Sequence, residues 1–137
     1  MTNRELITAA LRMLTVLDSD ETAPSPEDAK LGLAELNGTM FYLLSKTIDL
    51  GYPPQDNVSD DFPLGDVEAE AIKPIFAMRL SIYYPNKQPP SWLPVLAQSN
   101  ESQLLLNAVL ANMEEASMSN IPLGESNGRR CNIITGD

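Results

Sequence analysis

Apolar residues recur at steps of three and four along the first 116 residues of this chain, which is the spacing of one face of an α-helix. Residues 117–137 are polar, contain several glycines and have no such period. The sequence therefore predicts an all-α fold: a small bundle of about four helices over residues 1–116, followed by an extended C-terminal arm over residues 117–137. The first part holds the whole net charge of −10, because bases and acids are equal in number in the second.

Start signals define the first two helices. Thr2 and Glu5 form a T-x-x-E capping box, and Ser25 followed by Pro26 supplies an N-cap and a first helical residue. The first helix is expected to end before Asp18 and the second near Lys46. Their apolar faces are Leu6, Ala10, Met13, Leu14 and Leu17, then Ala29, Leu33, Leu36, Met40, Leu43 and Leu44. Residues 47–52 are expected to form a short extended piece.

Two further helices follow a loop at residues 55–65. Asp66 is the expected N-cap of the third, in which Pro74 is expected to cause a kink because it lacks a backbone donor. The fourth is expected to begin between Ser91 and Pro94 and to end by Ala116, with the polar stretch 98–103 exposed or locally bent. The expected apolar faces are Ala69, Ile72, Phe76, Met78, Leu80 and Tyr83, then Trp92, Leu93, Leu96, Leu104, Leu105, Ala108 and Ala111.

Composition excludes several kinds of site. The chain has no histidine, so it has neither a histidine base nor a histidine metal ligand, and its one cysteine, Cys131, cannot form an internal disulfide. A net charge of −10 argues against a nucleic-acid binder, which needs a basic face. No apolar run approaches the ~20 residues of a membrane span. Gly124, Gly128 and Gly136 are too widely spaced for a phosphate loop. We expect no cofactor and no membrane contact.

One group of acidic residues could be interpreted as a metal site and another as a catalytic pair, and we favour neither interpretation. Asp56, Asp60, Asp61, Asp66, Glu68 and Glu70 fall within fifteen residues, but their spacing does not match a calcium loop, and acids at a helix start need no ligand to explain them. Glu114 and Glu115 could be taken for a general acid–base pair. Neighbours in a helix point about 100° apart, so these two do not converge. The sequence favours a solvated acidic loop, no metal and no enzyme.

Aromatic and apolar residues at two places suggest packing or contact. Tyr83, Tyr84 and Trp92 lie around several prolines and are expected to form a buried cluster, with an exposed contact patch as the alternative. In the arm, two short apolar groups accompany a pair of arginines. We expect these to be anchors that dock on a neighbouring molecule, because apolar side chains gain most by burial. The anchor residues are Ile121, Pro122, Leu123, Arg129, Arg130, Ile133 and Ile134.

The order of these parts resembles that of phage head-to-tail connector (adaptor) proteins, in particular the tail accessory factor family of short-tailed phages. The resemblance covers roughly residues 4–112. It is carried by a first helix with the sequence ELITAALRML, a polar loop and a Ser/Pro-capped long helix, and then by the segments IDLGY at 48–52, DFPL at 61–64, EAI at 70–72, AMRL at 77–80 and YP at 84–85.

This resemblance implies a homo-oligomeric ring, usually of twelve copies, bound beneath the portal protein. The ring would lengthen the DNA channel and give the tail or nozzle protein a platform, at the head-tail junction of the virion, after assembly in the host cytoplasm. The helical bodies would pack side by side, and the arm would reach along the portal or an adjacent subunit. DNA would pass without specific binding, because an acidic channel or rim, for which Asp56, Asp60 and Asp61 are candidates, repels it at close range.

Two other functions compete with this hypothesis. An acidic helical module that mimics DNA, or that sequesters a basic partner, would need its acids aligned on one exposed face, whereas here they are concentrated in loops and at helix starts. A carboxylate-based hydrolase of cell-wall glycan would need two carboxylates facing each other across a cleft. We favour the structural ring subunit.

Overall fold

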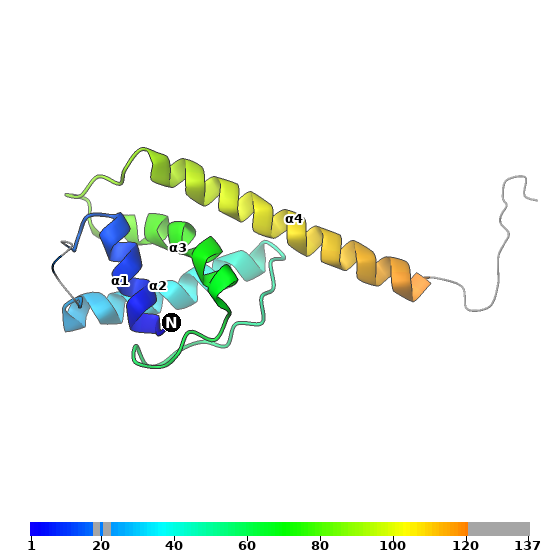
Figure 1. Ribbon diagram of the computed structural model, residues 1–137, viewed down its shortest axis with the longest axis horizontal. Coiled ribbons are helices and arrows are strands. Elements are labelled where there is room, and N and C mark those ends of the chain that lie inside the picture. Colours follow the sequence, from blue (N-terminus) through cyan, green and yellow to red (C-terminus); the bar gives the residue numbers. More distant parts are fainter. Residues whose placement is uncertain (18–19, 21–22, 121–137) are drawn as a thin grey trace, which may run out of the picture. The chain divides into compact units, whose positions relative to one another are not determined.

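The computed structural model describes residues 1–17, 20 and 23–120, with side chains described as far as Glu114. Within these residues the chain forms α1 (Asn3–Met13), α2 (Pro26–Ser45), α3 (Asp66–Leu80), the short 3-10 helix η1 (Ser81–Tyr83) and α4 (Trp92–Asn120), and no strand (Figure 1). The predicted all-α fold of about four helices is therefore confirmed. The chain divides into a compact unit, Met1–Leu106, and a second unit that begins at Asn107.

Helix α1 begins as its sequence predicts. The Thr2 side chain accepts a hydrogen bond from the Glu5 backbone N–H at 3.2 Å and donates one to the Glu5 carboxylate at 3.2 Å. The helix ends at Met13, earlier than its apolar pattern, because Thr15 takes a left-handed conformation with φ of 60°. Leu17 is nevertheless buried, so the apolar pattern outlasts the helix.

Helix α2 also follows its start signals. The Ser25 side chain accepts a hydrogen bond from the Asp28 N–H at 3.2 Å, and Pro26 is the first helical residue. After the C-cap residue Lys46, Thr47 adopts a left-handed conformation, which ends the helix. Leu44, which the apolar pattern places on the buried face, is half exposed.

Helix α3 differs from expectation at its first residue. Gly65 is the N-cap and Asp66 the first helical residue, and no side chain caps this end. The helix continues through Pro74, which is buried. Asp66 and Glu68 still place negative charge in the first turn, where it interacts favourably with the helix dipole.

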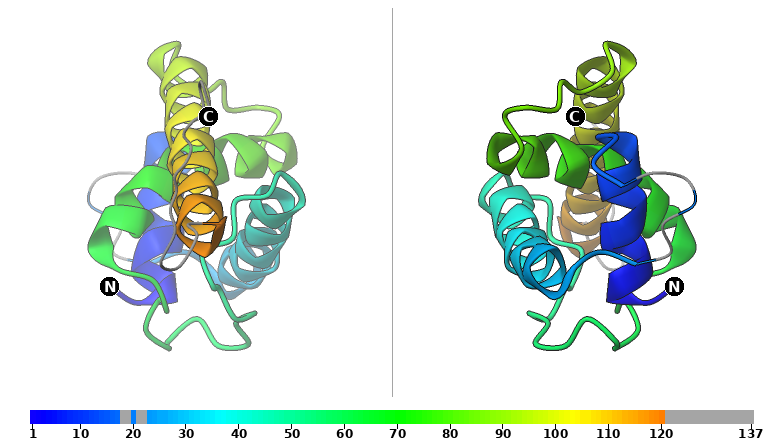
Figure 2. Two further views of the ribbon diagram at one scale, coloured as in Figure 1. Left: turned by 90° about the vertical axis from the view of Figure 1, so that its right-hand side faces the viewer. Right: turned by 90° about the vertical axis from the view of Figure 1, so that its left-hand side faces the viewer.

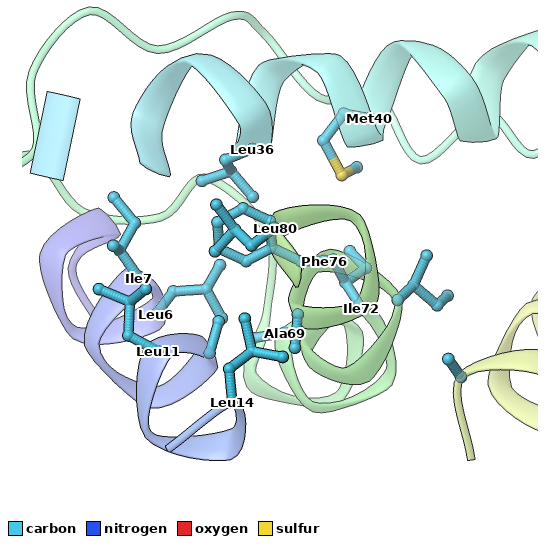
Figure 3. Close-up of a cluster of buried hydrophobic side chains, with 14 of the residues drawn as sticks. Leu6, Ile7, Leu11, Leu14, Leu36, Met40, Ala69, Ile72, Phe76 and Leu80 are labelled. Carbon is cyan, nitrogen blue, oxygen red and sulfur yellow. The ribbon is translucent and has the colours of Figure 1, made fainter. Parts of the chain in front are cut away.

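The core of the first unit lies between α1, α2 and α3 (Figure 3). Side chains from the three helices point toward one another, with Phe76 and Leu80 of α3 between Leu36 of α2 and Leu6 of α1. All four of these side chains are fully buried. At about 25 cal/mol per Å² of apolar surface, this burial is the main stabilising contribution to the fold.

The loop between α2 and α3 is held by side-chain amides and by backbone hydrogen bonds to residues 1–4, without a strand in the described residues. Asn37 donates to the Gln55 carbonyl and accepts hydrogen bonds from the Gln55 N–H and from the Tyr52 hydroxyl, at 2.6–3.0 Å. Asn3, which is fully buried, donates to the Gln55 side chain and to the Asn57 carbonyl. In the extended piece expected at residues 47–52, Thr47 lies in a turn, and residues 48–52 have no regular secondary structure and form no strand.

Helix α4 packs on a face that matches the predicted one only in part, at Leu93 and Leu104. Leu93 and Ala97 are buried, and three residues further along Asn100 donates a hydrogen bond to the Ala71 carbonyl at 3.0 Å. The helix also continues to Asn120, beyond the expected end at Ala116. The prediction failed because the true packing face includes polar residues. Four residues expected on the buried face are exposed: Trp92, Leu96, Leu105 and Ala111.

Two glycines of α2 make a matched test of helix packing. A Cβ on Gly32 would lie 2.6 Å from Cγ2 of the buried Ile7, whereas one on Gly38 would meet nothing closer than 3.8 Å. We expect Gly38→Ala to stabilise the protein by up to ~1 kcal/mol, because alanine favours helix. Gly32→Ala is expected to destabilise it by ~1–3 kcal/mol through overpacking. Urea unfolding measures both, and equal effects would contradict the packing of α1 on α2.

Candidate interaction groove

A groove of about 640 Å³ lies within the first unit, between α2, α3, η1 and the first part of α4. Ile75, Met78 and Ile82 form its apolar side from α3 and η1, and Ala97 and Leu105 form the facing side from α4. Polar residues from three helices lie at its edge. Its full lining is Tyr42, Lys46, Ile75, Met78, Arg79, Ile82, Pro94, Ala97, Gln98, Glu101, Ser102 and Leu105.

Tyr42 of α2 is the centre of the polar edge. Its ring has the Lys46 ammonium 5.1 Å from its centroid and the Arg79 guanidinium 5.0 Å from it, both within cation–π range. Its hydroxyl donates to the Glu101 carboxylate at 3.0 Å, and Lys46 pairs with the same carboxylate oxygen at 3.3 Å. These contacts fasten α4 to α2. The Tyr42 side chain first, and the Glu101 carboxylate second, raise the pKa of Lys46 above its ordinary value.

A second carboxylate neutralises the other cation. Arg79 Nε donates to Glu35 Oε2 at 2.9 Å, and the Tyr83 hydroxyl donates to Glu35 Oε1 at 3.1 Å. The hydrogen bond to this carboxylate raises the pKa of Tyr83. The two cations and two carboxylates at the groove are thus held in pairs. A groove with apolar walls and a satisfied polar edge is suited to receive an apolar side chain, with hydrogen bonds at its rim.

Several large apolar side chains of η1 and of the first turn of α4 are exposed. Ile82 is 76% exposed, Val95 70% and Trp92 51%, and Tyr83 is also about half exposed. The buried aromatic cluster predicted for Tyr83, Tyr84 and Trp92 is therefore wrong, and only Tyr84 is partly buried. The reason is that α4 turns Leu93, not Trp92, toward the core.

The acidic residues selected from the sequence lie at the surface. Asp56 lines a separate cavity of about 450 Å³ together with Arg4 and Lys30, and Asp60 and Asp61 lie exposed on the loop that precedes α3. Within the part of the chain that the structure describes, no three acidic, cysteine or histidine side chains are grouped to hold a metal ion.

Within the described residues, the structure does not bring the two neighbouring glutamates of α4 together as a general acid–base pair. Glu114 is exposed, and the side chain of Glu115 lies outside the described residues. The arm anchors also lie outside the described residues, so the structure does not place them: Ile121, Pro122, Leu123, Arg129, Arg130, Ile133 and Ile134.

Sequence reasoning missed the polar edge of the groove. A signal for it exists in α2, where Glu35, Tyr42 and Lys46 are spaced by seven and four residues and so share one helical face. Their partners, Arg79 and Glu101, are far away in sequence and carry no such signal.

Two tyrosines of the first unit are expected to make the stability of the fold depend on pH in the alkaline range. Burial raises the pKa of Tyr52 and of Tyr84 above the ordinary 10.0, and the Asp28 carboxylate adds to the effect at Tyr84. Both stay neutral in the folded protein while the unfolded chain ionises. Their contribution to stability is therefore full below pH 10 and is lost as the pH rises further. The loss is at most ~1.4 kcal/mol per pH unit for each tyrosine, and less here because both are only partly buried.

Urea unfolding between pH 8 and pH 11 measures this slope. Tyr52→Phe removes one ionisable group and should make the slope shallower. A slope that is unchanged in this variant would contradict the role of Tyr52.

Among the residues that the structure describes, no helix combines the length and the apolar character that crossing a bilayer requires. Comparisons of the chain with protein-family models, with curated proteins and with solved structures give no match.

Proposed function

We propose that this chain is a structural subunit of a phage head-to-tail connector, an adaptor that forms a homo-oligomeric ring, usually of twelve copies, under the portal protein. The ring extends the DNA channel and provides the platform for the tail or nozzle protein. Support comes from the resemblance in the order of parts and from the all-α fold, which has the helices that this resemblance implies.

The observation that carries the proposal is the apolar surface of the first unit. Ile82 is exposed in the wall of the groove, and Trp92 and Val95 are exposed in the first turn of α4, the helix that forms the facing side of the groove. Exposed apolar groups that gather in one region mark interaction sites, whereas scattered single ones need no explanation. A subunit that works only in an assembly buries such a surface against neighbouring molecules.

The arm gives the subunit its second means of attachment. Its two apolar groups, 121–123 and 133–134, dock on the portal or an adjacent subunit, and Arg129 and Arg130 pair with acidic groups there. The body supplies many such groups, because residues 1–116 carry the net charge of −10. The candidates for an acidic channel or rim that does not hold DNA are Asp56, Asp60 and Asp61.

Mass photometry and negative-stain imaging of the full chain, alone and with the portal of its phage, test this function. We expect a ring with a central hole, at least when the portal is present. A protein that stays monomeric in the presence of the portal contradicts the proposal. The same preparation is assayed for hydrolysis of cell-wall glycan and for binding to a basic protein. Turnover of glycan would favour the enzyme hypothesis, and tight monomeric binding of the basic protein would favour the DNA mimic.

A further inference from the structure

The charge of the first unit is unevenly distributed along the chain. Residues 71–100 hold three basic side chains, Lys73, Arg79 and Lys87, and no acidic one, whereas the other residues of the chain hold six basic and nineteen acidic side chains. Lys73 and Arg79 pair with acids, but Lys87 is exposed, and the described residues give it no ion-pair partner. This stretch therefore forms a region without acids of its own in a strongly acidic protein.

The same stretch carries exposed apolar side chains. Ile82 and Tyr83 of η1 and Trp92 and Val95 of α4 are exposed on either side of Lys87 in the chain. We call these five residues the η1–α4 surface. An apolar surface with an available cation suits a partner that is both apolar and acidic.

The opposite character appears at residues 60–68. Asp60, Asp61, Asp66 and Glu68 are accompanied by Val67, which is 80% exposed, and the stretch contains no base. We call these five residues the acidic edge. Figure 1 shows the loop that precedes α3 on the lower side of the first unit, and the connection from η1 to α4 on the upper side. Figure 2 shows the same separation in both perpendicular views.

We propose that the η1–α4 surface of one copy binds the acidic edge of a second copy. Asp60 and Asp61 then belong to this contact, and of the three channel or rim candidates Asp56 alone remains for the channel. Two complementary surfaces on opposite sides of one unit make a heterologous contact, in which each copy uses one surface toward each neighbour. Such contacts repeat and close into a ring when the rotation between copies allows it. The inference rests on the self-association in the proposed function, but it does not require the portal.

The test uses two full-length variants, each changed on one surface. The first variant, Ile82→Ser with Lys87→Glu, alters the η1–α4 surface. The second, Asp60→Lys with Asp61→Lys, alters the acidic edge, whose loop is held through backbone groups of Asp60 and Phe62 and not through the two aspartate side chains. Sedimentation and mass photometry measure the size of the assemblies, and circular dichroism checks that each variant keeps its helices.

Each variant alone is expected to associate at least about tenfold more weakly than wild type. Mixing the two should yield a 1:1 heterodimer and nothing larger, because the pair retains one intact contact. Matched controls make the same kinds of change at other exposed positions, and both controls should assemble as wild type does. They are Phe41→Ser with Lys30→Glu for the first variant, and Asp20→Lys with Glu114→Lys for the second.

Several outcomes would overturn the assigned surfaces. The first is that the variants assemble like wild type, and the second is that the folded variants do not bind each other when mixed. The third is that the wild-type protein never self-associates. The fourth is that the first variant self-associates normally and loses only its binding to the portal. Rings that persist in both variants refute these surfaces and leave the ring itself intact. The two mixed variants can also form the heterodimer while the wild-type protein associates but never closes into a ring. That result supports the two surfaces and refutes the ring.

Discussion

Under the proposed function, removal of residues 121–137 is expected to leave the helical body folded and to reduce its incorporation into phage particles at least about tenfold. The core of the described residues runs from Leu6 to Ala97, within the compact unit Met1–Leu106. Burial of one aliphatic side chain contributes ~1.5–3 kcal/mol, and four of the proposed anchors in the arm are aliphatic: Ile121, Leu123, Ile133 and Ile134. Complementation of a deletion phage with the truncated protein, followed by quantification of the subunit in purified particles, measures the effect.

A full-length variant distinguishes the effect of losing the apolar anchors from the effect of shortening the arm. Serine at the four aliphatic positions should behave like the truncation, because it removes the apolar groups and keeps the chain. The matched control, Glu125→Ser with Asn127→Ser, changes polar residues of the same arm and should be incorporated like wild type. Particles that contain the truncated subunit or the four-serine subunit at normal levels would contradict the role of the arm.

Replacement of Phe76 by alanine is expected to cost ~3–5 kcal/mol of folding free energy. Phe76 is fully buried in α3, between side chains of α1 and α2, so its removal leaves a cavity that three helices line (Figure 3). A loss of this size is a large part of the ~5–15 kcal/mol that stabilises a typical domain. Urea or thermal unfolding followed by circular dichroism measures it.

Val67→Ala is the control for this change, because it truncates an exposed side chain in the same helix. Its effect should stay within about 0.5 kcal/mol. Phe76→Leu, which keeps most of the volume, should fall between the two. A loss at Phe76→Ala no larger than that at Val67→Ala would show that Phe76 is not central to the core.

The parts of the fold that depend on neighbours in the chain could be predicted from the sequence. The caps at Thr2 and Ser25 act over three residues, and each places its helix start correctly. Much of the core faces of α1, α2 and α3 follows for the same reason, because spacing by three and four needs no knowledge of the partner, although Ile7, Leu11 and Ile75 are buried outside the predicted faces. Leu6, Leu36 and Phe76 are buried, as their patterns indicate.

Contacts between distant residues could not be predicted in this way. The polar stretch 98–103 of α4 is expected from its composition to be exposed or bent, yet Asn100 and Glu101 both bind residues of other helices. Because these polar residues belong to the packing face, the apolar residues Trp92, Leu96 and Leu105 lie at the surface. The groove and the η1–α4 surface both result from this arrangement.

Local signals in the chain thus account for its helical class, for the first residues of α1 and α2 and for many of the buried side chains of the first three helices, because caps and helical spacing act over a few residues. The packing face of α4 and the meeting of Tyr42, Arg79 and Glu101 follow only from the folded arrangement of the helices. Single polar contacts between distant helices have no periodicity, so the sequence carries no pattern from which they could be recognised.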